Sequence, residues 1–127
     1  MIVAGIGCRR GAPAEDIVSL TLAVLASLGI ARENLDAIAT ETLKADEHGI
    51  ANAARCLSVP LVRCSIVDLE GVADKVLTRS ARVQALKGVP SIAEASALVA
   101  AGHNGRLLSA RVAADNVTCA IAIGEGS

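Results

Sequence analysis

The residues best suited to chemistry lie in a glycine-rich stretch near the start of the chain, Gly5-Ile6-Gly7-Cys8-Arg9-Arg10-Gly11. It places a thiol and two adjacent guanidinium groups between glycines. A glycine-rich turn that leads from a strand into a helix lets the backbone approach a ligand closely, and arginine forks suit carboxylates and phosphates. The stretch therefore predicts a loop that binds an anion.

Two later clusters are predicted to share one edge of a sheet with this loop. The first follows a second strand, and the second begins a later helix. Ligands of open α/β sheets bind outside the carboxyl ends of the strands, so we expect a single ligand-binding site there. Its candidate residues are Gly7, Cys8, Arg9, Arg10, Gly11, Thr40, Lys44, Asp46, Ser91 and Glu94.

Each of these features also has a purely structural interpretation. Loop arginines are commonly solvated. Cys8 fits a tight turn as a small residue, and this interpretation is preferred because the sequence identifies no histidine or carboxylate partner for the thiol. Ser91 and Glu94 have the spacing of a capping box, which needs no ligand, and both interpretations stay open. Cys8 and Glu94 remain the candidate catalytic residues.

An alternation of strands and helices is predicted to position these groups. Apolar runs predict strands at residues 2–7, 35–40 and 60–64, with helices between them. Pro13 is expected at the first position of the first helix, which Gly29 ends. Asp46 is expected to cap the second helix, and Ser65 the third.

The second half of the chain is predicted to be helical and then to form a hairpin. Residues 72–101 read as helical, with a break at Gly88-Val89-Pro90 and caps at Ser80 and Ser91. Segments 107–112 and 117–123 flank a turn at Asp115-Asn116. In the last segment small residues alternate with bulky ones, so its small face is expected to lie under a helix.

The fold class follows from this order of elements. We predict an α/β fold with one compact domain over residues 1–127 and a mixed, mostly parallel sheet. Helices are expected on both faces of the sheet, and the C-terminal segments should form an antiparallel hairpin.

Composition disfavours several classes of protein. The chain has no Phe, Tyr or Trp and a net charge of −1, so it lacks the stacking platforms and the basic surface of nucleic-acid binders. No apolar run approaches the length that spans a bilayer, and no secretory signal is recognised. We therefore expect a cytoplasmic protein that binds neither nucleic acid nor membrane.

No metal or cofactor is expected. The four cysteines form no C-x-x-C pair and the two histidines are isolated. The glycine spacing is G-x-G-x-x-x-G, which departs from the dinucleotide fingerprint, and the Gly-Lys-Ser/Thr of a phosphate-binding loop is absent. Cys56, Cys64 and Cys119 are predicted to lie in the core, and both histidines at the surface.

Four stretches together resemble one known family. They are Gly5-Ile6-Gly7-Cys8-Arg9-Arg10-Gly11, Leu43-Lys44-Ala45-Asp46-Glu47, Gly88-Val89-Pro90-Ser91-Ile92-Ala93-Glu94-Ala95-Ser96-Ala97-Leu98 and Val117-Thr118-Cys119-Ala120-Ile121-Ala122. In this order, and over nearly the whole chain, they are similar to the cobalamin biosynthesis family that comprises CobE and the C-terminal domain of CbiG.

The resemblance implies a role in building the corrin ring of vitamin B12. It implies that the chain binds or handles a carboxylate-rich corrinoid or precorrin intermediate, with Arg9, Arg10 and Lys44 holding the carboxylates and Ser91 adding a hydrogen bond. One alternative is a hydrolase-type enzyme acting on a precorrin, related to the lactone opening assigned to CbiG as a whole, with Cys8 or Glu94 doing the chemistry. Another is a structural partner of a different enzyme of the cobalamin pathway.

Overall fold

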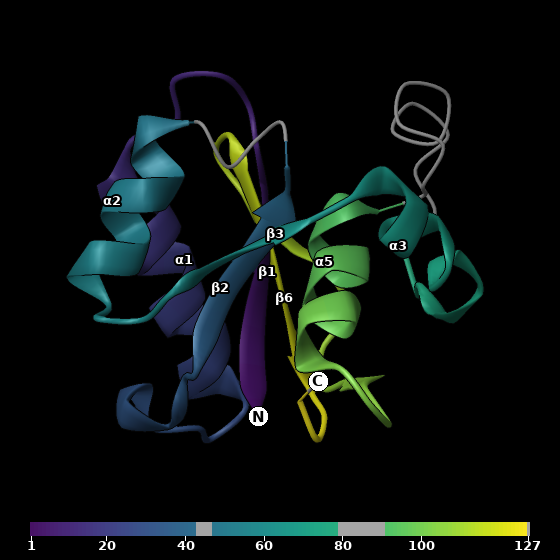
Figure 1. The fold of residues 1–127 in the computed structure, drawn as a ribbon. Helices are drawn as coiled ribbons and strands as arrows, with labels where there is room; N and C mark the ends of the chain where they lie inside the picture. Colours follow the sequence, from purple (N-terminus) through teal and green to yellow (C-terminus); the bar gives the residue numbers. More distant parts are fainter. Residues whose placement is uncertain (43–46, 79–90, 127) are drawn as a thin grey trace.

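A mixed β-sheet with helices on both faces makes up the fold (Figure 1). The computed structural model describes residues 1–42, 47–78 and 91–126. The strands are β1 (Ile2–Cys8), β2 (Ala37–Glu41), β3 (Leu61–Cys64), β4 (Arg106–Leu107), β5 (Val112–Ala114) and β6 (Val117–Ile123). The helices are α1 (Ala14–Ser27), α2 (His48–Cys56), α3 (Ile66–Glu70) and α5 (Ile92–Ala101), with short 3₁₀ turns η1 (Arg32–Asn34) and η3 (Ala73–Lys75).

The strand order is β3-β2-β1-β6-β4, and β5 also pairs with β6. Parallel pairing joins β1, β2 and β3, while β6 runs antiparallel to β1, β4 and β5. The predicted α/β fold with a mixed sheet is confirmed, as is the hairpin, which turns at Asp115 with φ 55°. The sheet was predicted to be mostly parallel. Among the described strands, the β1–β2 and β2–β3 pairings are parallel, whereas β6 pairs antiparallel with β1, β4 and β5.

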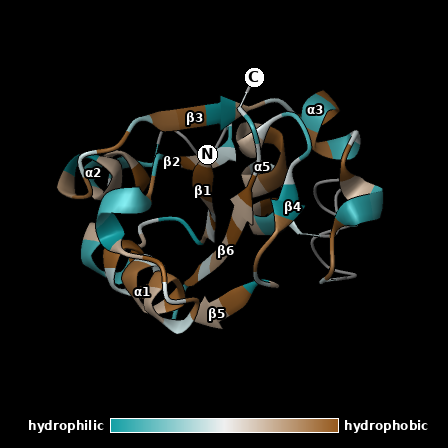
Figure 2. Cartoon of the chain, turned by 90° about the horizontal axis from the view of Figure 1, so that it is seen from below, coloured by the Kyte–Doolittle hydropathy of each residue, from teal (hydrophilic) through white to brown (hydrophobic). Residues whose placement is uncertain are grey.

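The helices form one layer on each face of the sheet. Two successive crossovers in the same direction place α1 and α2 on the same face, and α5 covers the other face (Figure 1). In Figure 2 hydrophobic colours run along the central strands β1 and β6. The largest hydrophobic side chains of the core are aliphatic, among them Ile6, Ile17, Ile38, Ile50 and Ile121 on the α1 side.

A glycine sets how closely α5 approaches the sheet. A Cβ atom on Gly5 would lie 1.9 Å from the Ala93 carbonyl oxygen and 2.7 Å from the Ala97 nitrogen. Ala122 of β6 is buried in the same layer, which confirms the prediction that the small face of the last strand lies under a helix. The first turn of α5 is thereby fixed near the end of β1.

Three sequence predictions about elements need correction. The expected strand at 107–112 is interrupted because the Leu108 and Ser109 N–H groups both donate to the Ile121 carbonyl, a bulge that separates β4 from β5. Pro13 is the N-cap residue of α1 and not its first helical residue. The N-cap residue of α2 is Glu47 and not Asp46.

The helical segment predicted at 72–101 is confirmed only in part: residues 73–75 form a 3₁₀ turn and 92–101 form α5, whereas 76–78 are not helical. Ser65 and Ser91 both cap their helices, and Gly29 ends α1 with φ +70°. The predicted break at 88–90 and the cap at Ser80 lie outside the described residues. Over the ranges 1–42, 47–78 and 91–126, no helix is long and apolar enough to cross a membrane.

Candidate functional site

The candidate site lies at the edge of the sheet where β1, β2 and β3 end. The starts of α1, α2 and α5 and the β5–β6 turn lie at this edge, which is at the top of Figure 1, with both termini at the bottom. Helix starts present unpaired N–H groups and the positive end of the helix dipole. The edge is therefore suited to binding anions.

The loop between β1 and α1 carries the two arginines. Arg9 and Arg10 are both exposed. The Arg9 N–H donates to the Asn116 carbonyl over 2.9 Å, and the Ala12 N–H donates to the Arg9 carbonyl over 3.2 Å. Gly11 has φ +80°, a conformation that favours glycine. The backbone of the loop is thus fixed by the hairpin turn while its cations face solvent.

Helix α2 is held against this loop. The Gly11 N–H donates to Oε2 of Glu47 over 3.2 Å. A Cβ atom on Gly49 would lie 2.1 Å from the Ala12 carbonyl oxygen, so only glycine permits this approach. The two contacts bring the start of α2 beside the start of α1.

Three other candidates are buried or packed and help to build the edge. The Thr40 hydroxyl donates to the Ile6 carbonyl over 2.8 Å and has no exposed surface. The Gly7 carbonyl accepts from the Thr118 hydroxyl, and a Cβ atom on Gly7 would lie 2.6 Å from that oxygen. Cys8 is half-buried and packs against the core under α1. These residues position the loop and do not face solvent as the arginines do.

Ser91 and Glu94 form only half of the predicted capping box. The Glu94 N–H donates to the Ser91 hydroxyl over 3.4 Å. The Glu94 carboxylate, which is completely buried, accepts instead from the Thr78 N–H at 2.8 Å, the Thr78 hydroxyl at 3.0 Å and the Arg111 N–H at 2.8 Å. It ties α5 to two segments that are distant in the sequence.

The predicted site is therefore brought together only in part. Arg9, Arg10 and Gly11 lie together at the exposed edge, whereas the side chains of Thr40, Ser91 and Glu94 are buried behind it. The candidates Lys44 and Asp46 lie outside the described residues.

Sequence reasoning missed one buried carboxylate at this edge. Glu41 is the last residue of β2, pairs with Cys64 of β3 and is 1% exposed. The sequence places it at the start of a polar stretch, where an exposed loop residue is the ordinary expectation. One signal for its burial is available: Glu41 is a charged residue at the end of a fully buried strand, Ala37–Glu41.

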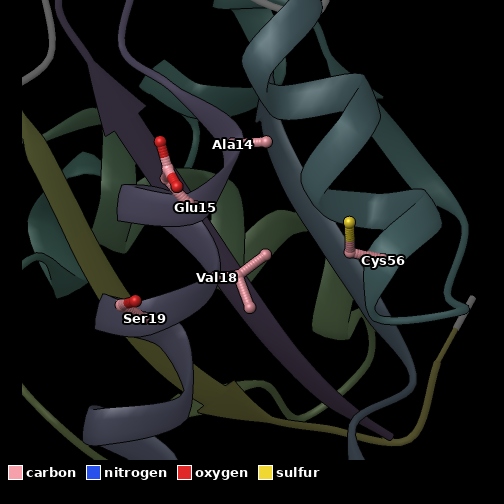
Figure 3. Close-up of a pocket in the computed structure, with 5 residues that line it drawn as sticks. All are labelled: Ala14, Glu15, Val18, Ser19 and Cys56. Atoms are coloured by element: carbon pink, nitrogen blue, oxygen red, sulfur yellow. The ribbon is translucent and has the colours of Figure 1, made fainter.

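A shallow open groove of about 490 Å³ lies between α1 and α2. Ala14, Glu15, Val18 and Ser19 of α1 line it together with Cys56 of α2. Figure 3 shows Val18 and Cys56 on its two sides. Cys56 is exposed, so the prediction that it lies in the core is wrong.

The other two predicted core cysteines are buried. Burial, with a smaller contribution from the negative charge of Asp68, raises the pKa of the Cys64 thiol to about 11. Burial raises the pKa of Cys119 to about 12, against a smaller lowering by its hydrogen bond with Thr21. Both thiols are therefore protonated at neutral pH and poor nucleophiles.

The described part of the chain holds no group of three or more His, Cys, Asp or Glu side chains placed to bind a metal ion. Both histidines are exposed, as predicted. What the edge offers chemically is therefore cationic side chains, backbone N–H groups and one half-buried thiol.

Comparison with known proteins shows that the chain is similar to proteins of cobalamin biosynthesis. The chain is 33% identical over 121 residues to Protein CobE of Sinorhizobium sp, covering 95% of this chain and 79% of that protein. The crystal structure of CobE, a protein from the cobalamin (vitamin B12) biosynthetic pathway, superposes with a TM-score of 0.92 at 33% identity. That match covers 100% of this chain and 92% of the other.

A second solved structure of a cobalamin biosynthesis protein has the same fold. The cobalamin biosynthesis protein chiG from Agrobacterium tumefaciens has a TM-score of 0.79 and 39% identity, over 98% of this chain and 99% of the other. The family model described as "Cobalamin synthesis G C-terminus" matches residues 2–122. Since that match spans nearly the whole chain, the protein belongs to the cobalamin synthesis G C-terminal family and takes part in cobalamin biosynthesis.

Proposed function

We propose that the protein binds a carboxylate-rich corrinoid or precorrin intermediate at the carboxyl edge of the sheet. The observation that carries this proposal is the exposed pair Arg9 and Arg10 on a loop whose backbone is fixed beside two helix starts. Corrin precursors carry a rim of acetate and propionate carboxylates, which guanidinium forks bind in bidentate fashion.

The charge of the whole chain does not by itself attract an anionic ligand. A net charge of −1 gives no general attraction for a polyanionic ligand. The affinity must therefore come from cations gathered at one place. Because the chain has no aromatic residues, the macrocycle itself would be contacted by aliphatic groups.

The surroundings of Glu94 favour binding over catalysis by this residue. Both of its carboxylate oxygens accept hydrogen bonds, and the side chain is completely buried. A general acid or base must reach the proton that it moves, and Glu94 is not presented to a ligand at the surface. Cys8 is then the remaining candidate for covalent chemistry.

The proposal is tested by titrating the protein with hydrogenobyrinic acid and following the visible absorbance of the corrinoid. The wild type should give a saturable spectral shift. Arg9→Ala/Arg10→Ala should weaken binding by about 1.5–3 kcal/mol for each lost charged hydrogen bond.

The matched control removes two positive charges at other places. Arg55 lies in the last turn of α2, and Arg106 pairs with Ile123 at the far end of β6. Arg55→Ala/Arg106→Ala should bind as the wild type does. If neither hydrogenobyrinic acid nor other late corrinoid intermediates gave a spectral shift with the wild type, the proposal would be contradicted. Equal weakening of binding in both double variants would reduce the role of Arg9 and Arg10 to a general charge effect.

A separate variant distinguishes a binding protein from an enzyme. Cys8→Ser changes one atom at a half-buried position. A binding protein should keep its affinity and its function in the pathway. Retained affinity with loss of product formation would instead identify Cys8 as a catalytic nucleophile.

A further inference from the structure

The protein places one of its own carboxylates against the loop that the proposed ligand would contact. The Gly11 N–H donates to Oε2 of Glu47 over 3.2 Å. Gly11 directly follows Arg9 and Arg10, both of which are exposed. An internal carboxylate is therefore bound to the backbone of the loop whose next two residues towards the N-terminus are the exposed arginines.

The bond between Gly11 and Glu47 differs from the other hydrogen bonds of the loop. The Arg9 and Ala12 N–H groups donate to backbone carbonyls, which strand pairing and the turn hold in place. The acceptor of Gly11 is instead a side-chain carboxylate oxygen, and this contact is exposed. This bond can be exchanged for one to a ligand without opening the sheet edge.

The position of Glu47 also departs from its ordinary role. Glu47 is the N-cap residue of α2, yet its side chain makes no capping hydrogen bond to its own helix. An N-cap side chain normally accepts from the second or third N–H group of its helix. Here the carboxylate reaches to the neighbouring loop, and the contact between Gly49 and Ala12 keeps the two segments close.

We infer that Glu47 sets the affinity of the site by competing with a ligand carboxylate for the Gly11 N–H and for the field of Arg9 and Arg10. This inference rests on the proposed function. When a carboxylate ligand binds, the Glu47 side chain gives up Gly11 and turns to solvent. Two carboxylates within several Å of each other repel even in water, so removal of the Glu47 charge strengthens binding by about threefold to tenfold.

The experiment compares hydrogenobyrinic acid titrations of the wild type, Glu47→Gln and Glu47→Ala. The dissociation constant should fall about threefold to tenfold in Glu47→Gln and at least as far in Glu47→Ala. Glu33→Gln, which removes an exposed carboxylate in η1, is the matched control and should bind as the wild type does. Thermal unfolding of each variant verifies that it is folded.

Weaker binding in the Glu47 variants would overturn the inference, because Glu47 would then hold the loop in its binding conformation. Unchanged binding would overturn it as well. In either case the corrinoid titration of the wild type still reports on the proposed function by itself.

A second measurement observes the Gly11 amide directly. In ¹H–¹⁵N spectra, tricarballylate, a small tricarboxylate without a macrocycle, should shift the Gly11 resonance at lower concentration in Glu47→Gln than in the wild type. Arg9→Ala/Arg10→Ala should abolish the shift. A Gly11 response without any corrinoid binding would reject the proposed ligand and keep the competition, whereas corrinoid binding with an unresponsive Gly11 in Glu47→Gln would reject the competition alone.

Discussion

Single residues at the sheet edge divide into those that face solvent and those that hold the edge together. The capping role of Ser91 was predictable, because it depends on residues three positions apart. The partners of the Glu94 carboxylate were not predictable, because Thr78 and Arg111 are 16 and 17 positions away. Local spacing reveals a cap, but only the fold reveals where the rest of the side chain goes.

Glu94→Gln should destabilise the protein. The two oxygens of Glu94 accept from two backbone N–H groups, those of Thr78 and Arg111. An amide has only one oxygen, so in either orientation its NH₂ group faces one of these donors. The expected loss is on the order of 1–3 kcal/mol in the free energy of unfolding, measured by urea denaturation.

The matched control for this change is Glu70→Gln at an exposed position, which should alter stability little. Equal stability of Glu94→Gln and the wild type would show that the three hydrogen bonds contribute nothing net. Glu94 would then become a candidate for chemistry again.

At the scale of elements, the long regular segments were predictable and the short irregular ones were not. Strand β1, helix α1 and strand β6 follow from apolar runs and helical spacing. The division between β4 and β5 depends on two successive N–H groups that share the Ile121 carbonyl. No glycine or proline in segment 107–112 marks the bulge, so pairing with β6 decides it.

Gly5→Ala should displace α5 from the sheet. The new Cβ atom would lie 1.9 Å from a backbone oxygen of the helix, which cannot move by a rotamer change. Overpacking of this kind costs about 3 kcal/mol or more. Because Gly5 lies in β1, which leads directly into the loop that carries Arg9 and Arg10, affinity for hydrogenobyrinic acid should fall along with the midpoint of urea unfolding.

Gly71→Ala is the matched control for that substitution. Gly71 is exposed at the end of α3 with φ −62°, and a Cβ atom there would meet its nearest atom at 3.2 Å. Its midpoint should stay close to that of the wild type. If Gly5→Ala unfolded at the wild-type midpoint, the close approach of α5 to β1 would not be a constraint of the fold.

For the whole molecule, the sequence indicated the layers better than the site. Alternating strands and helices with right-handed crossovers predict helices on both faces of a mixed sheet, as observed. The insertion of β6 beside β1 is long-range, and it brings the Asn116 carbonyl to the Arg9 N–H. That contact shapes the candidate loop, so the site depends on topology that local patterns do not encode.

The two buried thiols make the stability of the whole molecule sensitive to alkaline pH. Cys119 lies in the core under α1 and α2, and Cys64 in the core under α5. Folding raises the pKa of these thiols from 9.0 to about 12 and about 11. Below pH 9 both thiols are protonated in the folded and unfolded states, so the stability that they contribute is fully present.

As the pH rises from 9 towards 11, the unfolded thiols ionise while the folded ones stay neutral. The free energy of unfolding should therefore fall by about 1.4 kcal/mol per pH unit for each thiol. Cys119→Ala should remove about half of this thiol-dependent slope in urea denaturation, whereas Cys56→Ala, which removes an exposed thiol, should keep the wild-type slope. The same slope in all three proteins would mean that Cys119 ionises equally in the folded and unfolded states, and the aliphatic core under α1 and α2 would then admit solvent on the timescale of titration.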